Sequence, residues 1–196
     1  AVTYIEVTYP DGISFTGSGV VVGQNDVLTA SHVIYDSSHG GLAEDITVYP
    51  GRDGFESPYG SYEWDNANYF EVDQDGDGLL SRSDSERDLA ILGFDETIGL
   101  ETGYFGLDAD AGDGSFNLTG YPGSYAGLSG PRMTNDYGSA ETGSYDFVWE
   151  YETIESNPGN SGGPLWYEQN GDPYVTGISS TGGWAVDVFA QYDNIL

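Results

Sequence analysis

Turn-forming residues interrupt this chain so often that little helical periodicity is left. Between clusters of Gly, Pro, Asn and Asp lie short segments in which apolar and polar residues alternate, such as 3–9, 46–49 and 174–178. Alternation with a period of two places the apolar side chains on one face of a half-buried strand. Many such strands at short spacing predict an all-β sandwich or barrel.

The charge of the chain excludes several kinds of partner. The formal net charge is −29, with 33 acidic residues against four arginines and no lysine. We therefore expect no binding to nucleic acid or to an anionic membrane. The acids are spread along the strand patterns, which argues against a disordered chain. Because repulsion of this size must be screened for the chain to stay compact, we expect a surface adapted to high salt, where the Debye length shrinks to about 3 Å at 1 M. A surface that attracts cationic substrates is the alternative.

Length and missing residue types add further bounds. A chain of 196 residues can bury a sizeable core, either as one domain or as two small packed ones. No apolar run approaches the roughly 20 residues that a membrane span needs, so we expect a soluble monomer. There is no cysteine, which excludes disulfides and a cysteine nucleophile. The start at Ala1, without a Met or a signal peptide, suggests a mature, processed form.

One serine lies in a glycine-dense turn, Asn-Pro-Gly-Asn-Ser-Gly-Gly-Pro at 157–164. A serine hydroxyl becomes a nucleophile only when a base takes its proton and donors hold the oxyanion that forms. Gly159 allows the backbone to turn so that its own N–H and that of Ser161 point at one oxygen. The chain has 30 glycines, so a plain surface turn is the alternative. The presence of partners for Ser161 decides between the two.

Two histidines, His32 and His39, are the candidate bases. His32 follows the apolar end of a predicted strand, whereas His39 lies in a Ser- and Gly-rich loop and is expected to be solvated. Asp88 begins another apolar segment and is the candidate carboxylate that orients an imidazole. One acid before a strand means little in so acidic a chain, but the order His, Asp, Ser over separate segments supports a triad.

Four segments carry a family resemblance. They are Leu-Thr-Ala-Ser-His-Val (28–33), Asp-Leu-Ala-Ile-Leu (88–92), Thr-Gly-Tyr-Pro-Gly (119–123) and Gly-Asn-Ser-Gly-Gly-Pro (159–164). In this order they resemble the chymotrypsin-like (trypsin-like) serine endopeptidases, and most closely the bacterial glutamyl endopeptidases. The resemblance runs from about Phe15 to the C-terminus, with an insertion before Asp88.

The resemblance implies a fold of two packed six-stranded antiparallel β-barrels. The first barrel would occupy residues 1–100 and the second 113–196, with a linker at 101–112. A short C-terminal helix is expected within 188–196. The catalytic groups would then meet in the cleft between the barrels.

The resemblance also implies the role of each candidate residue. His32 would be the general base, Asp88 the carboxylate that orients it, and Ser161 the nucleophile. The N–H groups of Gly159 and Ser161 would form the oxyanion hole. The substrate would be a protein or peptide.

The insertion before Asp88 contains a calcium-binding pattern, Asp-x-Asp-x-Asp-Gly followed by an acid at position twelve. A hard cation prefers several oxygens, and alternate residues of a tight loop can all face inward. Position twelve is an aspartate, whose short side chain is expected to bind through one oxygen. We expect a structural calcium ion that fixes the strand presenting Asp88, while a chance acidic loop is the alternative. The predicted ligands are Asp73, Asp75, Asp77, Leu79 (through its carbonyl), Ser81 (through a water) and Asp84.

The residues expected to set specificity depart from the glutamyl endopeptidases. Ser179 stands where those enzymes have a histidine that helps bind an acidic side chain. Glu155, six residues before Ser161, has the spacing of the acid that binds Arg or Lys at the base of the pocket in trypsin-like members. A buried carboxylate there would favour a cationic side chain. The predicted specificity residues are Glu155, Ser156, Ser179, Thr181 and Trp184.

The sequence therefore predicts a serine endopeptidase that cleaves after Arg or Lys through an acyl-enzyme. Cleavage after Glu or Asp is one alternative. A catalytically inactive relative that uses the double barrel for binding is another, and a calcium-dependent scaffold is a third. The protein is expected to be secreted, bacterial and from a saline environment.

Overall fold

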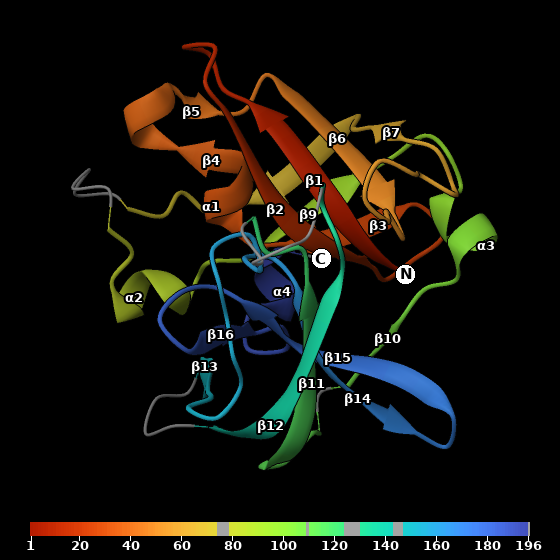
Figure 1. Cartoon of the computed structure of the whole chain (residues 1–196). Helices are drawn as coiled ribbons and strands as arrows, with labels where there is room; N and C mark the ends of the chain where they lie inside the picture. The colour runs from red at the N-terminus through yellow and green to blue at the C-terminus, as the bar shows by residue number, and fades with distance from the viewer. Residues whose placement is uncertain (74–78, 109, 124–129, 143–146, 196) are drawn as a thin grey trace.

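The computed structural model describes residues 1–73, 79–108, 110–123, 130–142 and 147–195, and its strands form two large sheets (Figure 1). The N-terminal sheet has the strand order β7-β6-β1-β2-β3-β9-β8. Its strands are β1 (Val2–Thr8), β2 (Ser14–Val21), β3 (Asp26–Thr29), β6 (Asp45–Pro50), β7 (Tyr62–Glu63), β8 (Asn66–Tyr69) and β9 (Ala90–Gly93).

The C-terminal sheet lies below it in Figure 1 and has the order β10-β15-β14-β11-β12-β13-β16. An additional pairing of β15 with β16 closes six of these strands into a ring, so this half is a closed barrel. Its strands are β10 (Gly106–Leu107), β11 (Gly114–Gly120), β12 (Thr134–Thr142), β13 (Val148–Glu150), β14 (Pro164–Gln169), β15 (Asp172–Ser179) and β16 (Trp184–Asp187).

The helices of the described chain are short. A small hairpin of two further strands, β4 and β5, lies beside the first of them. These elements are α1 (Ser31–Ile34), β4 (Tyr35–Asp36), the 3₁₀ turn η1 (Ser37–His39), β5 (Gly41–Leu42), α2 (Arg82–Ser85), α3 (Ile98–Thr102) and α4 (Tyr192–Ile195).

The predicted alternation produces the core. In β6, Ile46 and Val48 are buried while Thr47 between them and Tyr49 after them are partly exposed. The largest buried cluster combines side chains of the N-terminal sheet with Val175, Ile178 and Val186 of the C-terminal barrel. One continuous apolar core therefore holds the two halves together.

The predicted all-β, chymotrypsin-like fold and its short C-terminal helix are confirmed, with two differences of detail. In the described residues the N-terminal sheet is a seven-stranded half-barrel with β7 and β8 at its edges. In addition, β10 lies inside the predicted linker 101–112 and pairs in parallel with β15. A two-residue strand is too short to show alternation, so the sequence pattern does not reveal it.

Candidate active site

The base candidate, His32, lies on the one-turn helix α1, directly after β3. Ser31 holds this helix against the strand that follows Asp88, because its Oγ donates to Leu89 O at 2.6 Å. The hydroxyl of Tyr9 donates to Val33 O at 3.0 Å on the other side. These contacts fix the backbone of α1 and with it the direction of the imidazole.

Asp88 precedes β9 and is fully buried, yet both of its oxygens have donors. Oδ1 accepts the backbone N–H of His32 at 2.9 Å, and Oδ2 lies 2.6 Å from His32 Nδ1. A third donor, Ser180 Oγ, reaches Oδ2 at 2.5 Å. Because an ionised carboxylate only accepts hydrogen bonds, the imidazole carries its proton on Nδ1 and leaves Nε2 free as a base.

Burial and charge act in opposite directions on the pKa of His32. Desolvation lowers the pKa and is the largest single influence. The charge of Asp88, its hydrogen bond and the charge of Asp36 together outweigh desolvation and hold the pKa above its usual value of 6.5. The imidazolium that forms when His32 takes a proton is thus stabilised.

The Ser161 turn is fastened to both halves of the molecule. Ser18 N, on β2, donates to Ser161 O at 2.8 Å, and Gly162 N donates to Ser179 O, on β15, at 2.8 Å. A Cβ on Gly162, whose φ is +83°, would overlap Ser18 O and Thr29 Oγ1. The glycine is needed because the backbone of this turn approaches β2 and β3 closely.

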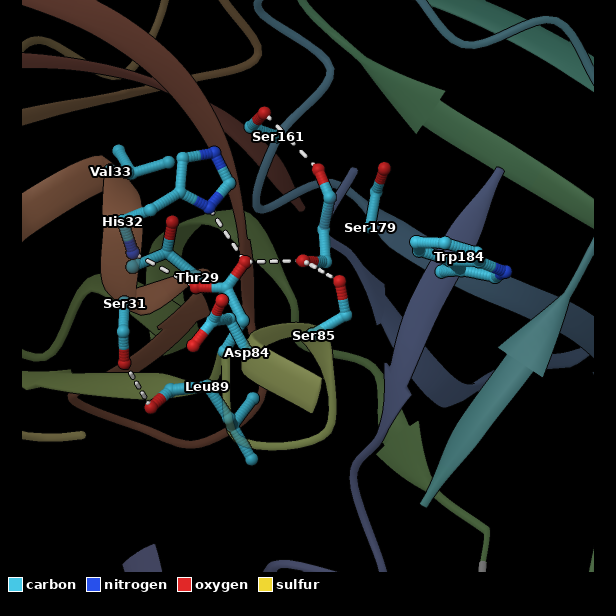
Figure 2. A network of polar contacts seen from close by, with 12 residues as sticks. Thr29, Ser31, His32, Val33, Asp84, Ser85, Leu89, Ser161, Ser179 and Trp184 are labelled. Carbon is cyan, nitrogen blue, oxygen red and sulfur yellow. Dashed lines mark hydrogen bonds and ion pairs between the residues drawn. The ribbon is translucent and has the colours of Figure 1, made fainter. Parts of the chain in front are cut away.

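Ser161 and His32 line the same pocket, which brings the predicted nucleophile and base together. Ser161 Oγ donates to Ser180 O at 3.5 Å, the long limit for such a bond, and no bond joins it to His32 (Figure 2). Hydrogen bonds between catalytic groups are often long or misaligned before substrate arrives.

The backbone of the turn supplies two candidate oxyanion donors. The Pro158 carbonyl accepts the Gly123 N–H at 2.8 Å, and in a trans peptide the Gly159 N–H must point the opposite way. Gly159 has a φ of +101°, and a Cβ there would lie 2.5 Å from Tyr121 O. Across the described residues, neither Gly159 N nor Ser161 N donates to a protein acceptor. Both donors are therefore available to a substrate oxygen.

A family model described as a trypsin-like peptidase domain matches residues 17–178. The chain belongs to this family. The trypsin-like peptidase fold is shared by a glutamyl endopeptidase solved in complex with MPD, with a TM-score of 0.71, 21% identity, and coverage of 97% of this chain and 88% of that one.

Two relatives of the chain are Bacillus proteins. It is 31% identical to "Glutamyl endopeptidase" of Bacillus licheniformis over 78% of this chain and 45% of that protein. It is 29% identical to "Extracellular metalloprotease" of Bacillus subtilis over 62% of this chain and 38% of that protein. The chain spans less than half the length of either relative.

Sequence reasoning missed two serines of the peptidase site. Ser180 Oγ contacts both Asp88 and Ser85 Oγ, the latter at 3.0 Å, and all three side chains are buried. Ser85 lies on α2, far from Ser180 in sequence, and Figure 2 shows it beside the bonds that reach His32. Nothing in the local pattern around either serine marks it.

The predicted specificity residues are arranged differently from the expectation. Glu155 is exposed, not buried at the base of a pocket; its carboxylate accepts from Asn157 Nδ2 at 3.1 Å. Its backbone N–H donates to the carboxylate of Asp136 at 2.6 Å. Ser156 is exposed as well.

The remaining specificity candidates follow Ser161 in the barrel. Ser179 is fully buried, with its Oγ 3.1 Å from Tyr151 OH. Thr181 and Trp184 are half-buried, and Figure 2 shows Trp184 beyond Ser179, on the side away from His32. Arg82 stacks over Trp184 at 5.8 Å and donates to Glu150 at 2.6 Å.

The structure describes four of the six predicted calcium ligands, Asp73, Leu79, Ser81 and Asp84, while Asp75 and Asp77 lie outside the described residues. Asp73 is nearly buried and has a left-handed backbone, with φ of +52°. Asp84 Oδ2 accepts the N–H of Ser81 at 2.8 Å and its Oγ–H at 2.6 Å, which caps α2. Within the part of the chain that the structure describes, no three acidic or histidine side chains are grouped as a metal site.

His39, expected to be solvated, is partly enclosed, with 25% of its side chain exposed. Its Nδ1 lies 2.7 Å from Asp11 Oδ2, and its ring contacts those of Tyr9 and Phe15 with centroid distances of 5.7 and 5.2 Å. A side chain in a polar loop can still be covered when two aromatic rings fold over it.

In the residues that the structure describes, no helix is long and apolar enough to cross a membrane.

Proposed function

We propose that the protein is a serine endopeptidase in which Ser161, His32 and Asp88 form the catalytic triad. The observation that carries the proposal is the buried Asp88 bound to His32 Nδ1 beside a pocket that His32 and Ser161 share. The family and its relatives supply the reaction class, which is hydrolysis of peptide bonds.

The chemistry follows from the arrangement. Ser161 Oγ attacks the substrate carbonyl while His32 Nε2 takes its proton, and the N–H groups of Gly159 and Ser161 hold the oxyanion. His32 then protonates the leaving amine, which frees it from the acyl-enzyme. Water attacks the acyl group by the same route in reverse, and Asp88 remains ionised throughout.

Labelling with a fluorophosphonate tests the triad directly, because the reagent reacts only with an activated serine. Wild type and Ser61→Ala, a change at an exposed serine, should label and cleave casein. Ser161→Ala should do neither, and His32→Ala should lose at least 10³-fold in kcat. Failure of the folded wild type to label would favour an inactive relative that only binds.

For specificity we propose cleavage after Arg or Lys. Support comes from the spacing of Glu155 from Ser161 and from the Asp136 carboxylate that its backbone N–H binds, two negative charges on one segment that would repel an acidic side chain. The name of the Bacillus licheniformis relative favours cleavage after Glu instead. Fluorogenic peptides that differ only before the scissile bond decide, with Glu155→Gln as the matched variant. A preference for Glu or Asp, unchanged in Glu155→Gln, would exclude the Arg or Lys assignment.

We also propose a structural calcium ion in the loop before α2. The described part is compatible with the ion, because Asp73 is nearly buried and Asp84 bonds to Ser81 through Oδ2 alone, which leaves Oδ1 for a metal. Bound calcium would supply charge compensation among the carboxylates and no chemistry. Chelation with EDTA should lower the melting temperature and kcat together, and calcium should restore both. Unchanged melting in excess EDTA would exclude the ion.

Secretion is a further part of the proposal, and it is supported by the name of the Bacillus subtilis relative, an extracellular protein. An immunoblot of culture medium against cells of the source organism tests it. Retention of all protein in the cells would contradict it.

A further inference from the structure

The pocket shared by His32 and Ser161 extends away from the segments expected to bind the acyl part of the substrate. Its volume is about 230 Å³. Apart from Ser161, its described lining comes from the N-terminal half, with Tyr9, Phe15 and Val33 as apolar walls. The specificity candidates at 155–156 and 179–184 do not line it.

Proton transfer fixes which part of a substrate lies there. His32 Nε2 must protonate the leaving amine, so that nitrogen lies within hydrogen-bond reach of the imidazole. The chain that follows the amine continues past His32, toward the N-terminal half. The pocket therefore lies on the leaving side of the scissile bond.

The apolar walls of this pocket are held rigidly. Tyr9 is 2% exposed, its hydroxyl is bonded to Val33 O, and its ring meets Phe15 edge-on at 5.9 Å. His39, itself fixed by Asp11, supports the Phe15 ring from another side at 5.2 Å. Phe15 is nevertheless 47% exposed, so a fixed aromatic face is presented next to the nucleophile. A preorganised apolar face binds a ligand at small entropic cost.

The negative charge at the pocket disfavours acidic side chains. Asp36 lines the pocket, and its Oδ1 accepts the Ser38 N–H at 2.8 Å and the Ser38 hydroxyl at 2.6 Å. A carboxylate held in this way repels an acidic side chain that enters. Apolar walls with an anionic rim fit a large aliphatic or aromatic side chain.

We propose that this pocket binds the side chain of the first residue after the scissile bond and that Phe15 makes the pocket selective for large apolar side chains. The inference rests on the proposed function, because it assigns a substrate residue to the same catalytic centre. It adds a second point of selection, independent of the residue before the bond.

Peptides that share one acyl segment and vary only after the scissile bond test the assignment. We expect kcat/KM to be about tenfold higher with Leu or Phe than with Gly at the first position, which corresponds to about 1.4 kcal/mol, and lowest with Glu. Phe15→Ala should reduce the Leu-to-Gly ratio to about threefold or less, whereas Phe15→Leu should retain it. Phe55→Ala, at an exposed phenylalanine that does not line the pocket, is the matched control.

A coumarylamide of the same acyl segment reports whether the triad of the wild type is active. Its aromatic leaving group would occupy the same pocket, so the Gly peptide is the reference substrate for Phe15→Ala. Transfer of the acyl group from Ser161 to added amino-acid amides gives a second readout, in which leucinamide should compete with water better than glycinamide.

The outcomes separate the inference from the proposed function. Absence of both coumarylamide turnover and fluorophosphonate labelling would overturn the proposed function. Normal coumarylamide turnover with equal rates for Leu, Gly and Glu peptides would overturn the pocket assignment alone. Selectivity confined to the second position, or unaffected by Phe15→Ala, would overturn it too.

Discussion

Replacement of Ser85 by alanine should slow the reaction although Ser85 touches neither substrate nor imidazole. Ser180 Oγ has one hydrogen, and the 2.5 Å contact with Asp88 Oδ2 uses it. The two hydroxyls lie 3.0 Å apart, and because the hydrogen of Ser180 is used by Asp88, the hydrogen between them comes from Ser85, whose only other acceptor among the described residues, Ser81 O, is more distant at 3.4 Å. Ser85 is thus a positioning residue, which holds Ser180 so that its hydroxyl points at Asp88.

The two hydrogen bonds predict decreases in kcat of different size. The bond between Ser85 and Ser180 joins neutral groups and is worth about 0.5–1.5 kcal/mol, so Ser85→Ala should lower kcat about 2- to 12-fold. The bond from Ser180 ends on a buried charge and is worth about 1.5–3 kcal/mol, so Ser180→Ala should cost about 10- to 150-fold. KM should change little in either variant, because neither hydroxyl is expected to contact substrate.

A double-mutant cycle with a coumarylamide substrate is the assay. If Ser85 acts only through Ser180, the double variant should be no slower than Ser180→Ala. Ser83→Ala, at an exposed serine on the same helix, should remain within about twofold of wild type. Independent, additive losses from the two serines would refute the relay, as would a full-rate Ser85→Ala enzyme.

Three further predictions concern pH, the oxyanion turn and salt. The surroundings of His32 hold its pKa above 6.5, and only the neutral imidazole accepts a proton. The value of kcat/KM should therefore fall with decreasing pH through a midpoint above 6.5. A flat profile from pH 5 to 8 would contradict His32 as the base. Gly159→Ala should lower kcat about 10²- to 10³-fold, because the added Cβ would displace an oxyanion donor. Gly60→Ala, at another left-handed glycine (φ +75°) with open space around it, is the control and should leave kcat unchanged. Added NaCl should raise the melting temperature by screening the net charge of −29; a steady fall in melting temperature as NaCl rises would argue against salt adaptation.

The sequence predicts those parts of the site that lie within local motifs. His32, Asp88 and Ser161 each belong to a short segment whose strand or turn character is visible, so their order suggested one site. Ser85 and Ser180 meet only through the packing of α2 against the C-terminal barrel, and a single hydroxyl leaves no pattern. The exposure of Glu155 was missed for a related reason, since spacing from Ser161 specifies position along the chain but not depth.

The fold was predictable to a similar extent. Alternation predicted the bounds of β1, β6 and β15 to within two residues, because burial of one face imposes the alternation. The parallel strand β10 and the open edge of the N-terminal sheet depend on pairings between distant segments. Such pairings have no counterpart in local composition.

The contacts between β2 and the Ser161 turn bear on when self-cleavage could begin under the proposed mechanism. Ser18 joins the halves through three bonds, from its N–H to Ser161 O, from its Oγ to Gly159 O, and from Tyr121 N–H to its Oγ. Neither half alone holds a nucleophile beside a base. With the proposed triad, a chain still emerging from synthesis, or a fragment cut between the halves, would lack a complete site. Under the proposed mechanism, activity therefore requires both halves of the chain to be present and packed through these contacts.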